Sequence, residues 1–352
     1  MVRLSRAETQ ERNRAKVLAA ARAEFAERGF RDAKVDAIAE RAELTRGAVY
    51  SNFPGKRALY FAVLADLAEQ APEPPTGQRG HTARDALGAF ARAWAARLPQ
   101  DAPGLGRDLV AEVVADERVR LPFTQLLKLD ALLLSLALEH VSPPKAIPGG
   151  PPARLVRLAE TVLTTLHGAT RLADAAPGFV EPFDVVSACE RLAGLEIGDF
   201  WASPDAVPPL QGADRPWSPH TGTDLVRGTP ARFGDGVVAI LGLHRLAAVE
   251  QAVRSGSDVT AVVVMSDPAE LAPLVRLVVA EVGSCLRQAF PPEAWPRLQI
   301  LCDESGVLAA AAGVPAVSDA TEVAVRVEAG RITGRAEGFG AGHAVAGKLI
   351  PR

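Results

Sequence analysis

The sequence predicts a multidomain protein in which all-helical regions are followed by an α/β domain. Over residues 9–195 apolar side chains recur mostly at spacings of three and four, which is typical of amphipathic helices. After residue 219, short β-branched runs alternate with helix-like stretches, which is typical of an α/β domain. A segment rich in Pro, Asp and Gly lies between these two patterns. We therefore divide the chain into domains 1–70, 78–200 and 220–352, with a Pro-rich linker over 201–219.

Composition and charge narrow the classes of protein that the chain can belong to. Apolar residues make up 48% of the 352 residues, which suits packed cores and not a disordered chain. The whole chain has a formal charge of −3, yet residues 1–60 contain 13 Lys and Arg against 8 Asp and Glu. A basic N-terminal segment followed by an acidic remainder is typical of a DNA-binding domain, because DNA is a polyanion.

The sequence shows no targeting, membrane or metal signal. The N-terminus is too charged for a signal peptide, and no run approaches the ~18 apolar residues of a membrane span, so we expect a cytoplasmic protein without a membrane partner. Cys189, Cys285 and Cys302 are odd in number and have no CxxC spacing. We expect no disulfide, no metal and no cofactor.

The first domain contains a pattern typical of a helix-turn-helix. The expected helices cover residues 9–28, 35–41, 45–52 and 56–70. Gly29 should end the first helix, and Thr45 is a plausible N-cap for the third. That third helix carries small and polar side chains of the kind that enter the major groove, while Gly47 allows close approach of the backbone to DNA.

This region resembles the N-terminal signature of the TetR family of regulators. The matching features are Gly29-Phe30, Ile38-Ala39, Gly47-Ala48-Val49-Tyr50, Phe53 and Lys56, in the order and spacing of that family. The resemblance implies double-stranded DNA as partner, with DNA contacts expected from Lys34, Thr45, Arg46, Gly47, Tyr50, Ser51, Asn52 and Lys56. Lys56 and Lys34 would bind phosphate. One departure from the family is Ala33-Lys34, where a hydroxyl residue often caps the second helix.

The resemblance also implies that residues 78–200 bind a small-molecule effector and form a homodimer. Side chains that could line an effector cavity are Trp94, Phe123, His140, Thr164, His167 and Arg171. The helical stretches 153–175 and 182–195 occupy the place where the family dimerises. No catalytic constellation is visible, so we expect no enzyme.

The C-terminal domain is similar to a thioredoxin-like or peroxiredoxin-like fold. The order strand, helix, strand, helix, strand, helix, hairpin carries the resemblance, together with the stretch 301–314 and the expected hairpin around Ala329-Gly330. A redox-active member needs a cysteine after its first strand, where this chain has His244 and Arg245. These two residues could instead bind an anion.

Three functions compete. The leading hypothesis is a ligand-responsive regulator, expected to be a repressor, that binds a pseudo-palindromic operator as a homodimer. The first alternative is a redox-active or redox-sensing protein with a DNA-binding domain, in which Cys285 or Cys302 would react. The second is a scaffold whose C-terminal domain recruits a protein partner. Because the linker follows the last expected bundle helix, we also expect deletion of 204–352 to leave a folded, DNA-binding dimer.

Overall fold

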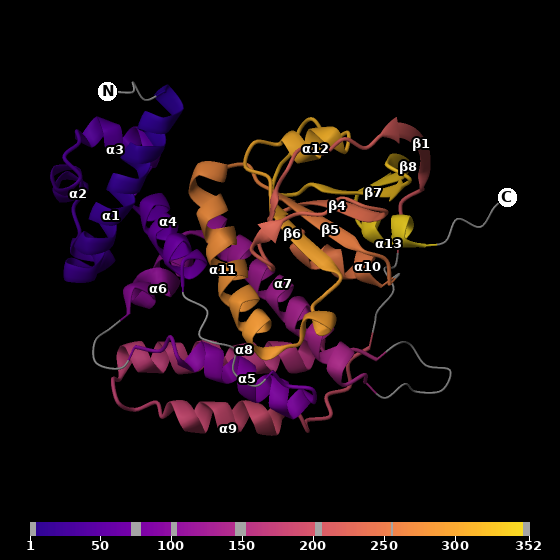
Figure 1. Ribbon diagram of the computed structural model, residues 1–352, viewed down its shortest axis with the longest axis horizontal. Helices are drawn as coiled ribbons and strands as arrows, with labels where there is room; N and C mark the ends of the chain where they lie inside the picture. The colour runs from indigo at the N-terminus through magenta and orange to yellow at the C-terminus, as the bar shows by residue number, and fades with distance from the viewer. Residues whose placement is uncertain are drawn as a thin grey trace.

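The computed structural model describes residues 5–71, 79–99, 104–144, 153–200, 206–254 and 256–347. Figure 1 shows a small helical unit at one side, a layer of helices below, and a mixed sheet at the other side. The part of the predicted linker that covers residues 201–205 lies outside the described residues. The described part agrees with the prediction of helical regions followed by an α/β domain.

The N-terminal unit contains the four predicted helices: α1 (Arg6–Asp32), α2 (Val35–Arg41), α3 (Arg46–Asn52) and α4 (Lys56–Glu69). Gly29 does not end α1 but interrupts it with a φ of 73°, and the chain resumes helical geometry for one more turn. The ring of Tyr60 on α4 lies 5.3 Å from that of Phe25 and 4.9 Å from that of Phe30, measured between centroids. These aromatic contacts join α4 to α1.

The helical middle region contains α5 (Ala83–Ala95), α6 (Leu109–Val114), α7 (Glu117–Val141), α8 (Val156–Ala175) and α9 (Pro182–Leu192), with a 3-10 turn over Leu105–Asp108 before α6. The helical stretch that follows this turn is interrupted at Asp116, which accepts a hydrogen bond from the N–H of Arg118 and so starts α7. By length and composition alone, α7 could span a membrane. Much of this helix is buried inside the protein.

The C-terminal domain is built on a six-stranded sheet with the order β1-β8-β7-β4-β5-β6. Its strands are β1 (Gln211–Pro216), β4 (Gly236–Gly242), β5 (Val259–Val264), β6 (Leu298–Cys302), β7 (Glu322–Glu328) and β8 (Arg331–Glu337). β4, β5 and β6 are parallel, whereas β7 pairs antiparallel with both β4 and β8. The predicted hairpin is confirmed: Ala329 and Gly330 have φ values of 50° and 71°, as a tight turn between β7 and β8 requires.

Short elements complete this domain. The helices are α10 (Val249–Val253), α11 (Pro268–Ala289), α12 (Val307–Ala311) and α13 (Ala341–Ala346), with 3-10 turns over Leu246–Ala248 and Pro292–Ala294. A two-stranded ribbon is formed by β2 (Thr223–Asp224) and β3 (Thr229–Pro230).

The second half of the predicted linker belongs to the sheet. β1 pairs antiparallel with β8, and the N–H of Trp217 donates to the carbonyl oxygen of Gly330. The Trp217 side chain is buried against that of Phe233. The polar composition of 211–216 concealed this strand because it lies at the sheet edge with mostly exposed side chains.

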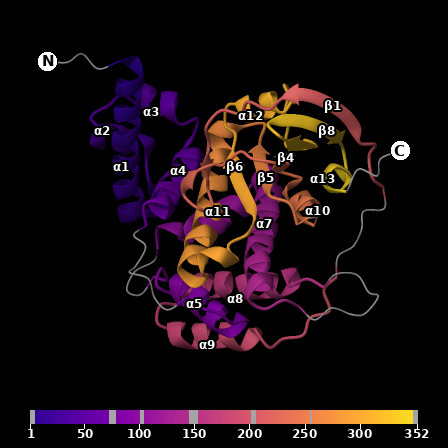
Figure 2. The ribbon, with the colours of Figure 1, turned by 45° about the vertical axis from the view of Figure 1, so that its right-hand side comes forward.

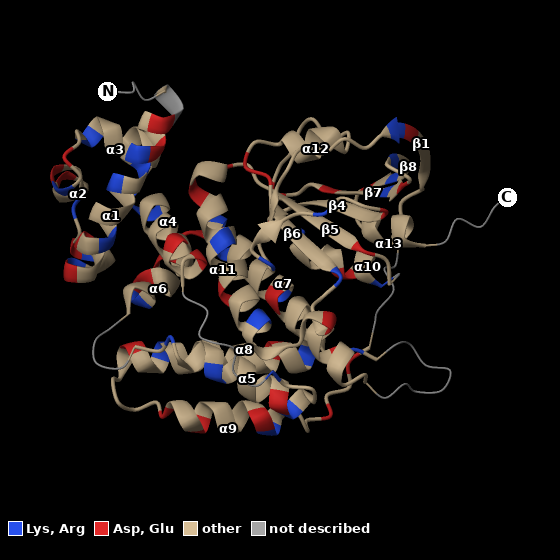
Figure 3. Ribbon diagram, in the orientation of Figure 1, with Lys and Arg blue, Asp and Glu red and all other residues tan. Residues whose placement is uncertain are grey.

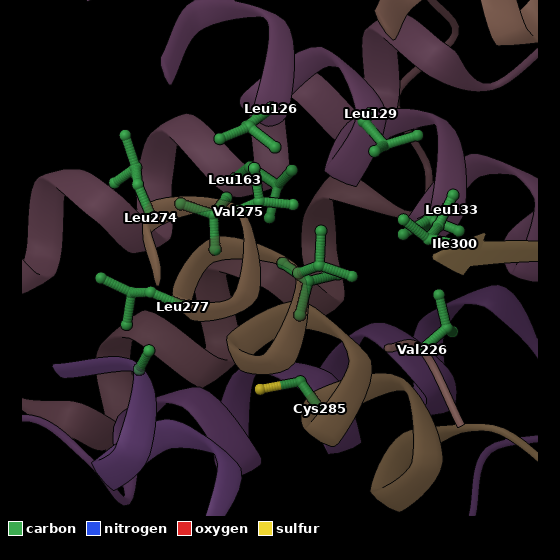
Figure 4. Close-up of a cluster of buried hydrophobic side chains, with 14 of the residues drawn as sticks. Leu126, Leu129, Leu133, Leu163, Val226, Leu274, Val275, Leu277, Cys285 and Ile300 are labelled. Atoms are coloured by element: carbon green, nitrogen blue, oxygen red, sulfur yellow. The ribbon is translucent and has the colours of Figure 1, made fainter. Parts of the chain in front are cut away.

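Helix α11 connects the sheet to the helical regions, which the sequence did not predict. It leaves the end of β5 and packs against α4, α5 and α7 before the chain returns to β6 (Figures 1 and 2). Figure 4 shows Leu126 of α7 and Leu163 of α8 near Val275 of α11, and Leu133 of α7 beside Ile300 of β6. One apolar core therefore extends from the N-terminal unit to the sheet. This packing contradicts the premise that residues 204–352 form a separable module.

Candidate DNA interface and effector cavities

The exposed face of α3 is the candidate nucleic-acid interface. The Thr45 hydroxyl accepts a hydrogen bond from the N–H of Ala48 at 3.2 Å, so Thr45 is the predicted N-cap. Val49 is buried in the small core, as is Phe53 just after the helix, and this leaves Gly47, Tyr50 and Ser51 exposed. The hydrophobic side of α3 therefore fixes which side chains face outward.

Arg46 and Tyr50 form the most prominent pair on this face. The guanidinium carbon of Arg46 lies 5.5 Å from the centroid of the Tyr50 ring, and Arg46 also pairs with Asp36 of α2 at 3.3 Å. Tyr50 remains 41% exposed, which leaves its ring available to a partner. The pair presents a cation and an aromatic surface together.

Ser51 and Asn52 make local hydrogen bonds. The Ser51 hydroxyl and the Asn52 side-chain amide both donate to the carbonyl oxygen of Ala48, at 2.9 and 2.8 Å. Asn52 is half-buried, whereas Ser51 is exposed. Of the two, Ser51 is the better placed to meet DNA.

The two predicted phosphate-binding lysines have different surroundings. Lys34 is the N-cap residue of α2 and is exposed, with no ion pair to any described residue. Lys56 donates from its ammonium group to the carbonyl oxygens of Arg31 and Ala33, at 3.0 and 3.1 Å. Lys56 therefore also ties the start of α4 to the end of α1, a role that the sequence analysis missed.

No described side chain caps the first turn of α2, but Glu24 of α1 contacts its N-cap residue. The buried carboxylate of Glu24 accepts a hydrogen bond from the N–H of Lys34 at 3.4 Å and pairs with Arg28 and Arg41. The carboxylate comes from α1, so no sequence pattern around α2 could have indicated it. Figure 3 shows that acidic and basic side chains mix on α1–α3, which means that much of the basic charge counted from the sequence is locally paired.

Two adjoining cavities lie within the helical middle region. The first has a volume of about 220 Å³, and its lining includes Trp94, Phe123, His167 and Arg171. The second has a volume of about 520 Å³. Phe123, His167 and Arg171 line it as well, together with Thr164. The structure thus brings together all of the predicted effector residues except His140.

His140 lies exposed in the last turn of α7 and lines neither cavity. It follows Phe123 by 17 residues of continuous helix, which places it about 25 Å farther along α7. Its assignment to the cavity was based on residue type alone.

His167 is the polar residue at the boundary of the two cavities. Its ring meets that of Trp94 edge to face with centroids 4.9 Å apart, and its Nε2 has no hydrogen-bond partner among the described residues. Burial, followed by the nearby charge of Arg171, lowers the pKa of His167 to about 4. The imidazole is therefore neutral at pH 7.

Glu281 of α11 also lines the first cavity, although the sequence analysis did not single it out. Removal from water raises the pKa of Glu281 to about 7, and the charges of Arg97 and Arg171 only partly oppose this effect. Val278 of α11 lines the same cavity. The C-terminal domain thus supplies part of the cavity wall, and only the packing of α11 could show this.

The site that would carry redox chemistry in the C-terminal domain contains an ion pair. Arg245 donates from Nε to the buried carboxylate of Glu322 at 2.8 Å. The guanidinium group that could have bound an anion is therefore already paired. Burial raises the pKa of Cys189 to about 11 and that of Cys285 to about 12, and it raises the pKa of Cys302 as well. These thiols are therefore protonated at neutral pH and are poor nucleophiles.

Helix α3 presents exposed polar and aromatic side chains, and α2 packs against it across a tight turn. This arrangement defines a helix-turn-helix DNA-binding protein. Comparison with known proteins names the family. Residues 17–63 match the profile of the family described as bacterial regulatory proteins, tetR family. Residues 17–63 therefore form a DNA-binding domain of the tetR type, and the chain acts as a DNA-binding transcriptional regulator.

Solved structures with similarity to the chain carry related descriptions. A TetR transcriptional regulator from Rhodococcus sp. RHA1 is 16% identical, with 53% of this chain and 95% of that chain covered and a TM-score of 0.30. A TetR-like regulator from the same organism is 21% identical, with 54% and 96% covered and a TM-score of 0.30. The fatty acid degradation regulator FadR from Bacillus halodurans is 15% identical, with 52% and 99% covered and a TM-score of 0.29. No curated protein sequence matches the chain significantly.

Proposed function

We propose that the protein is a ligand-responsive repressor that binds a pseudo-palindromic operator as a homodimer in the cytoplasm. The observation that carries this proposal is the exposed face of α3, where Arg46 and Tyr50 stand outward while Val49 anchors the helix. One such helix reads only a few base pairs, so two copies are needed for useful specificity.

The surface around α8 and α9 supports the homodimer. Phe179 and Phe183 are 72% and 74% exposed, and Leu172 near the end of α8 is 46% exposed. Large apolar side chains that gather on one surface indicate a protein partner. Because these residues lie where the family dimerises, a second copy of the chain is the partner that we propose.

The two cavities support a small-molecule effector. They combine aromatic walls from Trp94 and Phe123 with a few polar groups, among them His167 and Arg171. This mixture is typical of sites that enclose an apolar ligand and orient it by a few hydrogen bonds.

For the C-terminal domain we propose a thioredoxin-like fold that has lost the redox site. The element order β4, α10, β5, α11, β6, α12 and the β7-β8 hairpin supports the assignment. The Arg245–Glu322 pair after β4 and the raised pKa values of the thiols argue against a redox activity. Recruitment of a protein partner by this domain is the remaining alternative for its role.

The test is selection of bound duplexes from a random pool, followed by sedimentation of the free protein and of its complex. We expect an enriched inverted repeat and two protein chains on each duplex. Enrichment of no sequence, or a monomer both free and on DNA, would reject the proposal. An Arg46→Ala, Tyr50→Ala double variant that is folded but selects nothing is the matched control.

A further inference from the structure

Helix α11 belongs to the C-terminal domain by sequence and to the helical core by packing. It runs directly from β5 and leads back to the neighbouring parallel strand β6, so both of its ends are attached to the sheet. Nearly every residue of its two middle turns is buried. This helix is therefore attached to the sheet at both ends and buried against the helical regions in between.

Helix α4 is covered by α11 on the side opposite α1. Eight consecutive residues of α4, from Ala58 to Ala65, are buried, which leaves this part of the helix without a solvent-facing side. Its most extensive contacts are with α11 and α1. In Figures 1 and 2, α4 lies between α1 and α11 in both views. The helix that leads out of the DNA-binding unit is therefore packed against the C-terminal domain.

Ion pairs join α4 to α11 near both ends of α4. Near its start, Arg57 donates from Nε to a carboxylate oxygen of Glu270 at 2.8 Å, and it also donates to Asp116 at 2.9 Å. Near its end, Glu69 pairs with Arg276 at 3.5 Å. The Arg57 and Glu270 side chains are only 18% and 20% exposed, so salt screens this pair less than a surface pair.

Movement of α4 carries the recognition helix with it. Tyr60 of α4 packs on Phe25 and Phe30 of α1, and Lys56 is hydrogen-bonded to the end of α1. Val49 of α3 belongs to the same core as these rings. The unit α1–α3 is thus connected to α4 by packing as well as by the chain.

From these contacts we infer that Glu270 and Arg276 of the C-terminal domain are positioning residues for operator recognition. By holding α4 at both ends, α11 sets the direction in which each recognition helix leaves the body of the protein. In a dimer that direction fixes the distance between the two recognition helices, and therefore the half-site spacing that the protein accepts. This inference rests on the proposed homodimer.

The experiment compares affinities for a series of operators. The half-sites are those found by the selection, and their spacing is lengthened or shortened by one and two base pairs. For the unaltered protein we expect affinity to fall by about tenfold at the wrong spacings, comparable to the loss for a mismatched site. For the double variant Glu270→Gln, Arg276→Gln, we expect this penalty to shrink to about threefold or less, because the recognition helices can adopt several separations.

Asp116→Asn is the matched control. It weakens the other partner of Arg57, retains an N-cap for α7 and leaves the Arg57–Glu270 pair in place, so its spacing profile should stay steep. Leu277→Ala on α11 is a second test, because Leu277 lines a cavity together with Leu64 and Leu67 of α4. Folding of every variant is checked by circular dichroism.

The outcomes separate the two proposals. A flattened profile for the charge variant, with a steep profile for Asp116→Asn, supports the inference. Equally steep profiles for the charge variant and for Leu277→Ala would overturn it while leaving the operator-binding dimer intact. If the unaltered protein selects no inverted repeat, the proposed function itself fails, and this is visible before any variant is made.

Discussion

The ammonium group of Lys56 lies 4.6 Å from the centroid of the Phe30 ring. Together with the hydrogen bonds to the carbonyl oxygens of Arg31 and Ala33, this contact closes the end of α1 with a cation from α4. A positive charge is favourable there, because the carbonyl ends of a helix carry partial negative charge. The residue that we propose as a phosphate ligand is therefore also a structural link.

Replacement of Lys56 by alanine should affect both stability and DNA binding. Loss of two hydrogen bonds and a cation–π contact is expected to lower the free energy of unfolding by about 1–2 kcal/mol, measured by urea denaturation. The third N–H of the Lys56 ammonium group is the one that we expect to contact a DNA phosphate. Loss of this contact should lower the slope of log affinity against log salt concentration by about one unit. Lys34→Ala is the control, with the same change of slope and no loss of stability. A Lys56 variant of unchanged slope would show that its charge meets no phosphate.

Arg46→Ala should reduce specificity rather than general affinity. The guanidinium lies beside the exposed Tyr50 ring on the outer face of α3, where base edges are read. We expect a loss of about 1–3 kcal/mol on the operator and a smaller loss on unrelated DNA, measured by fluorescence anisotropy. Equal losses on both kinds of DNA would assign Arg46 to the phosphate backbone.

Glu281→Gln should change the pH dependence of stability. The folded protein raises the pKa of Glu281 from 4.5 to about 7, so it binds this proton more tightly than the unfolded chain does. The contribution of the protonated carboxyl is fully present below pH 4.5 and is lost as the pH rises to 7. Relative to the variant, the unaltered protein should lose roughly 2–3 kcal/mol across that window. Parallel stability curves would contradict the burial of this carboxyl.

His167→Gln should change stability in the opposite direction. Burial lowers the pKa of His167 from 6.5 to about 4, so protonation favours the unfolded chain. The contribution of the neutral imidazole is fully present above pH 6.5 and is lost as the pH falls to 4. The unaltered protein should therefore lose stability faster than His167→Gln on acidification through this range, as measured by thermal unfolding. Direct titration of the imidazole by NMR gives an independent check.

Deletion of residues 204–352 should give an aggregated or misfolded product, contrary to the expectation from the linker. The cut removes α11 and exposes the apolar surface of α4 from Ala58 to Ala65. It also removes Glu250, which pairs with Arg154 just before α8. Size-exclusion chromatography decides the matter, and a compact dimer that binds the operator would show that the bundle closes without α11. A protein cut after residue 347 is the control.

Local patterns in the sequence were sufficient for the helices of the DNA-binding unit and for the buried strands. Thr45 is the N-cap of α3, and the buried β-branched runs form β4, β5 and β6. Ala329 and Gly330 form the turn of the β7-β8 hairpin. Each of these features depends on residues within one element or one turn. Five of the six predicted effector residues line the two cavities, because apolar spacing along α5, α7 and α8 determines which sides face one another.

The features that escaped prediction depend on contacts between distant segments. Glu24 of α1 accepts a hydrogen bond from the N–H of Lys34 at the start of α2. β1 forms a strand only because β8 offers it an edge. The apolar residues of α11 predict a buried helix but do not indicate which surface buries it. His140 has a suitable side chain for a cavity but the wrong position along α7. Residue type identifies candidates, and only the tertiary arrangement selects among them.

The position of α11 in the chain has a consequence for biosynthesis. Helix α4 leaves the ribosome with its apolar residues already in place, but the helix that covers it is encoded roughly 200 residues later. At a synthesis rate of about 5–20 residues per second, α11 is completed on the order of 10–40 s after α4. The DNA-binding unit therefore cannot complete its packing during translation, and a chain released early would expose the apolar surface of α4 to chaperones and proteases.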